Sequence, residues 1–250
     1  MAKKQESRGK RQAMREQRLK RQRKQRLITI LVIAGVSLLV AGLFILPSLQ
    51  RALAPVGQVI QITPVERPMV DGASLGDANA PVLVEVWSDF QCSACRSFSE
   101  GIEPLIVENY VATGKARYVY RHFPFLDDGS LSKESDQAAH ASICASDQGR
   151  FWDYHDILFA NWNGTNSGAF SDKRLIAYAE SIGLDMGTFK KCFEENPHEE
   201  LINQDIAEGD NRGVSGTPSV FVNGRILSPG RVPPYEEIAA AIEAEIASGN

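Results

Sequence analysis

Leu27 to Leu46 is a run of 20 residues without a charged side chain, and it constrains the fold of this chain most strongly. As a helix rising about 1.5 Å per residue, it spans about 30 Å, the thickness of a bilayer's hydrocarbon core. Pro47 ends the run. The sequence therefore predicts one transmembrane helix over residues 27–47. A cleaved signal peptide is the alternative, but its apolar segment is usually roughly 7–15 residues long, which favours a retained anchor.

The charges are distributed very unevenly on the two sides of this run. Residues 1–26 contain 12 Lys and Arg but only 2 Asp and Glu, whereas the rest of the chain contains 15 basic and 29 acidic residues. Basic segments stay on the cytoplasmic side of a membrane. We therefore expect residues 1–26 in the cytoplasm and the acidic remainder outside the cytoplasmic membrane. Because nucleic-acid binding needs a positive face, the acidic body argues against a nucleic-acid partner.

Residues 48–79 are rich in Pro and Gly and poor in large apolar residues after Ile62. This composition is typical of a linker. The sequence thus predicts an extracytoplasmic linker over residues 48–79 and a folded domain over residues 80–250.

The domain begins with a pattern typical of an α/β fold. Residues 81–87 form a Val-rich run expected of a buried strand, a helix is expected from Cys92 to about Tyr110, and residues 116–120 read as a second strand. Two strands joined by a helical crossover are expected to be parallel. Pro104 is an objection, because a proline inside a helix should kink it.

Helical patterns then continue over about residues 128–212, and strands return near the C-terminus. Residues 217–222 and 225–227 are expected to form a hairpin, since Asn223-Gly224 between them is a strong turn signal. A final amphipathic helix closes the chain. The pattern predicts one α/β domain with a helical insertion.

Cys92 and Cys95 lie directly after the first predicted strand and open the following helix. At a helix start, free backbone N–H groups and the helix dipole stabilise a thiolate, and CxxC pairs in this setting have thiol pKa values of roughly 3.5–7.5. We expect Cys92 to attack and Cys95 to resolve the mixed disulfide. Half of a zinc site and a purely structural bridge are the alternatives. No second CxxC or closely spaced His pair supports a metal site.

The other two cysteines, Cys144 and Cys192, fall on different predicted helices of the insertion. In an oxidising compartment, a structural disulfide between them is the simplest expectation. Two buried free thiols are the alternative. Phe90 and Trp87, which flank the CxxC pair, are candidates for lining an apolar peptide groove, although core packing is equally compatible with Trp87.

Residues 75–248 resemble the DsbA-like thiol–disulfide oxidoreductases of the thioredoxin superfamily. The resemblance rests on four motifs in order, VLVEVWSDFQCSAC, RHFPF, GRFWDYHDILF and GVSGTPSVFVNG. It implies a thioredoxin fold with an inserted helical domain, which often carries a second disulfide, here Cys144 and Cys192. It also implies that Pro218 is cis and faces the Cys92–Cys95 pair, so that a substrate chain can pair with the backbone of Thr217.

Two positions depart from the family pattern. The relatives place a buried carboxylate six residues before the first cysteine, where this chain has Val86. Glu85 should point to the opposite face of the strand unless a bulge shifts it. Asp89 and Glu100 are possible substitutes, although such charges are more often solvated. The second departure is the Ser93-Ala94 dipeptide, which matches neither the strongly oxidising relatives nor thioredoxins and leaves the direction of electron flow open.

The resemblance implies an enzyme that introduces disulfides into exported Cys-containing proteins through Cys92 and Cys95. It requires no metal and no dissociable cofactor, and a quinone-linked membrane partner is expected to reoxidise the pair. A disulfide reductase or isomerase, for instance in cytochrome maturation, is the alternative within the same class. A non-catalytic peptide-binding or chaperone domain is the alternative from a different class.

Overall fold

The computed structural model describes residues 21, 23–40, 42–43, 56–127 and 133–249. The chain divides into two compact units, residues 1–55 and 56–250. In the first unit, residues 23–40 are helical. No helix within the described ranges has both the length and the apolar character needed to cross a bilayer. The transmembrane helix predicted over residues 27–47 lies partly outside the described residues, at positions 41 and 44–47.

The second unit is built on one five-stranded sheet with the order β1-β3-β2-β4-β5. The parallel pair β2 and β3 lies at its centre, and every other neighbouring pair is antiparallel. The β4–β5 turn has positive φ at both Asn223 and Gly224, as a tight two-residue hairpin requires. The strands are β1 (Ser74–Leu75), β2 (Val82–Ser88), β3 (Ala116–His122), β4 (Ser219–Val222) and β5 (Arg225–Leu227).

Alternate residues of β2 point to two differently covered faces of the sheet. Val84 and Val86 lie in the main apolar core, which also includes Ile242 of the C-terminal helix α9 (Tyr235–Ser248). Trp87 lies in a smaller cluster on the other face, and its indole N–H donates to the Asp205 carbonyl of α8 (Glu199–Asn211) at 2.9 Å. β2 is therefore buried on both sides, which explains its nearly continuous apolar sequence.

The helix predicted from Cys92 to Tyr110 is divided into three pieces. α2 (Ser93–Gly101) ends at Ile102, and α3 (Glu103–Ile106) and the π-helix η1 (Val107–Val111) follow. Pro104 occupies the first turn of α3. A helix leaves its first N–H groups unpaired, so the missing N–H of proline costs no hydrogen bond there.

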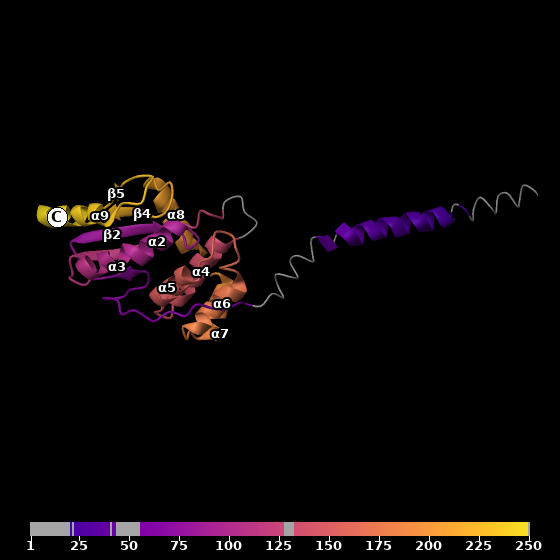
Figure 1. The fold of residues 1–250 in the computed structure, drawn as a ribbon, viewed down its shortest axis with the longest axis horizontal. Helices are drawn as coiled ribbons and strands as arrows, with labels where there is room; N and C mark the ends of the chain where they lie inside the picture. Colours follow the sequence, from indigo (N-terminus) through magenta and orange to yellow (C-terminus); the bar gives the residue numbers. More distant parts are fainter. Residues whose placement is uncertain (1–20, 22, 41, 44–55, 128–132, 250) are drawn as a thin grey trace, which may run out of the picture. The chain divides into compact units, whose positions relative to one another are not determined.

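The helical insertion follows β3, and residues 128–132 within it lie outside the described residues. In Figure 1 the first four helices of the insertion gather in one group beside the sheet. A disulfide between Cys144 and Cys192 joins two of these helices. They are α4 (Glu134–Ser146), α5 (Phe151–Ala160), α6 (Asp172–Ser181) and α7 (Met186–Glu195), and α8 completes the insertion.

The folded unit begins at Val56, whereas the sequence predicted a linker as far as residue 79. Val59 and Ile62 pack against the core. The backbone of Ile60 pairs with the side chain of Asn161, which accepts from its N–H at 2.8 Å and donates to its carbonyl at 2.9 Å. These partners lie about a hundred positions away in the sequence, so no local pattern in the segment reveals them. Residues 48–55 of the predicted linker lie outside the described residues.

Candidate active site

Cys92 lies where the chain leaves the end of β2 and enters α2. A turn over residues 89–91 separates it from the strand, and the Cys92 N–H donates to the Asp89 carbonyl at 3.0 Å. Cys92 is the N-cap of α2, with an extended backbone, and Cys95 falls in the first helical turn. Both are free thiols in this structure. The strand-to-helix junction thus places the Cys92 sulfur beside the unpaired N–H groups that begin the helix.

The Cys92 thiol is stabilised as a thiolate. Hydrogen bonding from Cys95 is the largest cause, and the Thr217 side chain and the N–H groups of Cys95 and Ala94 add to it, so that the pKa of Cys92 falls to about 6 despite partial burial. As a thiol, its Sγ donates to the Thr217 carbonyl at 3.3 Å. The residue is 9% exposed. At neutral pH, Cys92 is therefore mainly the nucleophilic thiolate.

Cys95 has the opposite character, although it lies only three positions further on. Its burial, followed by the hydrogen bond and charge of Cys92, raises the pKa of Cys95 well above the ordinary thiol value. It is 1% exposed. Cys95 therefore stays protonated while Cys92 is ionised, and a partner from solution reaches Cys92 first.

Thr217 and Pro218 lie next to the pair, joined by a cis peptide bond. The Thr217 carbonyl accepts a hydrogen bond from the Cys92 sulfur, as described above. The cis bond that the family resemblance implied is therefore present, and it adjoins the cysteines.

Phe90 does not line a surface groove, contrary to the sequence prediction. It is 1% exposed, and its ring packs against Tyr120 and Phe159 at centroid distances of 5.3 and 5.2 Å. The same aromatic cluster contains His122, whose burial lowers its pKa to about 3 and keeps it neutral. Phe90 faces inward because it lies in the turn after β2, two positions beyond the last strand residue Ser88, where its ring packs against Phe159 of α5.

The buried carboxylate that the family places before the first cysteine is absent at that position. The pairing of β2 with β3 runs without a bulge from Val82 to Ser88, so Val86 faces the cysteines and Glu85 faces away. Glu85 is 3% exposed and forms ion pairs with Arg121 and Arg212 on the other face, at 2.9 and 2.8 Å.

Asp89 is the carboxylate that the structure places beside the pair instead. It is 2% exposed, and it accepts hydrogen bonds from the N–H groups of Gln91 and Leu126 and from the Ser135 hydroxyl. Burial, with a smaller contribution from the Cys92 charge, raises the pKa of Asp89 to about 6. The sequence offered Asp89 only as a possible substitute, because two of its three donors come from residues 37 and 46 positions away. Glu100 is half exposed and pairs with Arg96 on the surface of α2.

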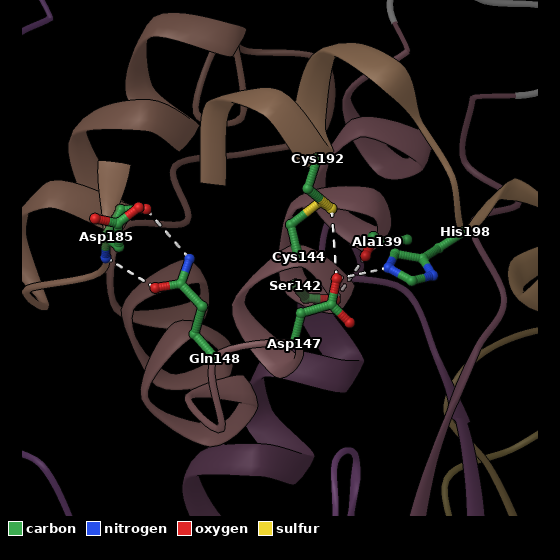
Figure 2. The surroundings of a disulfide bond; sticks show 8 residues. All are labelled: Ala139, Ser142, Cys144, Asp147, Gln148, Asp185, Cys192 and His198. Atoms are coloured by element: carbon green, nitrogen blue, oxygen red, sulfur yellow. Dashed lines mark hydrogen bonds and ion pairs between the residues drawn. A yellow bond between two sulfur atoms is a disulfide. The ribbon is translucent and has the colours of Figure 1, made fainter. Parts of the chain in front are cut away.

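The second cysteine pair forms a disulfide remote in sequence from the first. Figure 2 shows the Cys144–Cys192 bond between α4 and α7, with Asp147 and His198 beside it. His198 Nε2 lies 2.7 Å from Asp147 Oδ2, and Cys192 Sγ lies 3.7 Å from the same oxygen. Side-chain ligand atoms of these three residues lie within 4.8 Å of one another. Because Cys192 is bonded to Cys144, it has no thiolate to offer a metal ion.

The chain was compared with known proteins. Residues 69–244 match the family model described as thioredoxin. The chain is 30% identical over 177 residues to a probable disulfide bond formation protein D of Bacillus cereus, covering 69% of this chain and 78% of that protein. It is also 35% identical over 150 residues to a Na(+)/H(+) antiporter NhaA 3 of Salinispora tropica, covering 60% of this chain. The chain spans 21% of the length of that antiporter, about a fifth.

Among solved structures, the chain is similar to oxidised BdbD from Bacillus subtilis, with a TM-score of 0.63 and 25% sequence identity. That alignment covers 72% of this chain and 96% of BdbD. The architecture is an α/β thioredoxin fold with an inserted helical region. The family match over residues 69–244, together with the similarities to disulfide bond formation protein D and to BdbD, shows that the chain belongs to the DsbA/BdbD-like thiol–disulfide oxidoreductases of the thioredoxin superfamily.

Proposed function

We propose that this chain is a membrane-anchored, extracytoplasmic oxidoreductase that introduces disulfides into exported proteins. The observation that carries the proposal is the asymmetry of the pair. Cys92 is stabilised as a thiolate, with a pKa of about 6, whereas burial raises the pKa of Cys95. Stabilising the reduced pair in this way makes the corresponding disulfide a strong oxidant.

The reaction begins with the Cys92–Cys95 disulfide. A substrate thiolate attacks Cys92 Sγ, the bond to Cys95 breaks, and Cys95 takes the electron pair and then a proton. A second substrate thiolate attacks the substrate sulfur of the mixed disulfide and releases Cys92 as a thiolate. Two electrons pass from the substrate dithiol to the enzyme pair, and the other proton goes to solvent. The low pKa of Cys92 speeds the second step, because a more acidic thiol is a better leaving group.

Substrate binding rests on the backbone beside the pair. The Thr217 carbonyl lies 3.3 Å from Cys92 Sγ, two positions before the start of β4. An extended substrate chain can pair with this backbone as an added strand, which presents its cysteine to Cys92. Because main-chain pairing is independent of side chains, this mode suits an enzyme that acts on many exported proteins.

The cycle uses only two sulfur atoms, so the proposal includes no dissociable cofactor. The reduced pair must pass its two electrons onward, and we assign that step to a quinone-linked membrane protein. The apolar run over residues 27–46 and the basic segment before it, residues 1–26, support an anchored chain with its folded unit outside the cytoplasmic membrane.

The reduction potential of the pair tests the direction of electron flow. The full-length protein is equilibrated with glutathione buffers, and the reduced fraction is read from the mass of the alkylated peptide containing Cys92 and Cys95. We expect a reduction potential of about −120 mV, the level of a strong oxidant. A potential of about −270 mV would reverse the direction of electron flow and identify a reductase. A potential of about −180 mV would favour an isomerase.

Two variants make this titration specific. Cys144→Ala/Cys192→Ala lacks the second disulfide and should titrate like the unmodified chain, so that the signal belongs to the CxxC pair. Cys92→Ser should lose thiol exchange altogether. If Cys92→Ser still exchanges disulfides, the assignment of catalysis to Cys92 is wrong. An unmodified chain that exchanges no disulfides would instead favour a binding role that uses the peptide-pairing backbone.

A further inference from the structure

The helical insertion holds the turn that precedes the cysteine pair, and it does so through Gln91. Gln91 is 0% exposed and is joined directly to Cys92. A glutamine side chain carries a carbonyl oxygen and an NH₂ group, both of which need partners when buried. The described structure supplies those partners from distant parts of the insertion rather than from the turn itself.

The Gln91 amide is bonded on both sides. Its Nε2 donates to Ser135 Oγ at 2.8 Å and to Asp127 Oδ1 at 3.0 Å. Its Oε1 accepts from the Asn166 N–H at 2.5 Å. Asp127 and Ser135 belong to the region where β3 leads into α4, whereas Asn166 lies in the loop between α5 and α6, 75 positions from Gln91.

The main chain of Gln91 is bonded as completely as its side chain. The Gln91 carbonyl accepts from the Trp162 indole N–H at 2.7 Å and from the Thr165 hydroxyl at 3.3 Å. Its N–H donates to Asp89 Oδ1 at 2.8 Å. The α5–α6 loop therefore hydrogen-bonds the carbonyl of the peptide unit that joins Gln91 to Cys92.

The contacts that stabilise the Cys92 thiolate depend on its placement. The sulfur must meet the N–H groups of Ala94 and Cys95 and the Thr217 side chain together. Hydrogen bonds weaken steeply when distance or angle departs from the optimum. A small displacement of the N-cap of α2 would weaken several of these contacts at once.

We propose that Gln91 is a positioning residue, through which the helical insertion fixes Cys92 at the start of α2 in the geometry that thiol exchange requires. This inference rests on the proposed role of Cys92 as the exchanging thiol. A fully bonded buried amide specifies one geometry, whereas an apolar side chain of similar size fills the same volume without fixing the turn. The helical insertion therefore fixes the position of Cys92 in addition to enlarging the fold.

Gln91→Met in the full-length chain tests this role, because methionine keeps the length of the side chain and removes its hydrogen bonds. The measurement is the rate at which iodoacetamide alkylates Cys92 in the reduced protein from pH 4 to pH 9, read from the mass of the Cys92 peptide. We expect the pKa of Cys92 to rise by about 1. The alkylation rate at pH 6 should then fall about fivefold, since only the thiolate reacts.

Gln148→Met is the matched control. Gln148 also uses its amide to join two segments, donating to the Asp185 carbonyl at 3.3 Å and accepting from the Asp185 N–H at 2.8 Å (Figure 2). Those bonds lie between the end of α4 and the start of α7. Gln148 is less buried than Gln91, so removing its bonds should lower stability less, and it should leave the pH profile of Cys92 unchanged.

Trp162→Phe decides the question if Gln91→Met does not fold. Phenylalanine keeps an aromatic ring at this position but is smaller than tryptophan and lacks the indole N–H that donates to the Gln91 carbonyl. We expect the alkylation rate at pH 6 to fall about twofold. An unchanged profile in the folded Gln91 variant, or in the Trp162 variant when Gln91→Met is unfolded, overturns this inference alone. An unmodified protein whose Cys92 titrates like an ordinary thiol would instead overturn the proposed function.

Discussion

Two identical side chains three positions apart show how strongly residue chemistry depends on environment. Cys92 and Cys95 open the same helix, yet their thiol pKa values move in opposite directions. Hydrogen-bond donors around Cys92 lower its pKa, whereas burial away from solvent raises the pKa of Cys95. Asp89 follows the second route, because burial raises the pKa of its carboxyl group to about 6.

The pKa of Cys92 makes the stability of the reduced protein depend on pH. Its folded-state pKa of about 6 lies below the ordinary value of 9.0. A depressed pKa stabilises the fold fully above the ordinary value, and this stabilisation is lost as pH falls through the folded-state value. We therefore expect the unfolding free energy of the reduced protein, minus that of reduced Cys92→Ser, to rise between pH 6 and pH 9.

Urea unfolding of both proteins at several pH values measures this difference. Asp89 has the opposite sign, because its folded-state pKa is raised and the stability it provides is lost as pH rises through about 6. Since both proteins contain Asp89, its direct effect cancels in the difference. A difference that stays constant from pH 6 to pH 9 would show that Cys92 is an ordinary thiol in the fold.

Among the elements, the segment before β1 is held to the helices by ionic contacts rather than by its own secondary structure. Arg67 donates two hydrogen bonds to Asp156 of α5, at 3.0 and 2.8 Å, and lies 3.9 Å from Glu103 of α3. The guanidinium also lies over the Trp152 ring, 5.1 Å from its centroid. Glu103 is 3% exposed, and its burial raises its pKa.

Arg67→Met should therefore destabilise the fold strongly. It removes the guanidinium that Asp156 and the buried Glu103 share and leaves only the His155 ring beside both carboxylates. Breaking a buried pair in this way costs roughly 3–5 kcal/mol. Arg117→Met is the control, because its partner Asp71 is 80% exposed, and surface pairs contribute roughly 0–1 kcal/mol. Denaturant unfolding compares the two variants. Equal losses would mean that residues 56–70 are not an integral part of the folded unit.

On the scale of the whole molecule, the distribution of charge supports the proposed location of the folded unit outside the cytoplasmic membrane. Residues 1–26 carry a net positive charge, and the residues after the apolar run 27–46 carry a net negative charge. Positive segments are retained on the cytoplasmic side, and the acidic body carries no comparable signal. The active pair, which needs substrates with unpaired cysteines, would then face proteins as they emerge from export.

A membrane-impermeant maleimide tests this topology in intact cells that express the full chain. After mild reduction, we expect Cys92 to be labelled from outside and the chain to sediment with membranes. Cys92→Ser should lose the label, which makes the signal specific to that thiol. Labelling that appears only after the cells are lysed would place the folded unit in the cytoplasm and refute the proposed location.

Features that depend on neighbouring residues could be predicted from the sequence. Alternation and apolar runs predicted the parallel β2–β3 pair and the β4–β5 hairpin, and the spacing of Cys92 and Cys95 predicted a reactive pair at a helix start. Hydrophobic periodicity and turn chemistry act over a few residues, so one sequence is enough to detect them. The cis bond before Pro218 was implied by family motifs rather than by any local physical signal.

Features that depend on distant partners could not be predicted in this way, because they arise from the packing of the folded unit. Phe90 is buried because α5 covers it, the folded unit begins at Val56 because Asn161 and Asp156 hold the segment, and Gln91 is bonded by residues up to 75 positions away. A polar residue in a turn has the same local pattern whether it is solvated or fully bonded in the interior. Its role is set by the three-dimensional contacts that replace water, and those contacts exist only once the helical insertion has packed against the sheet.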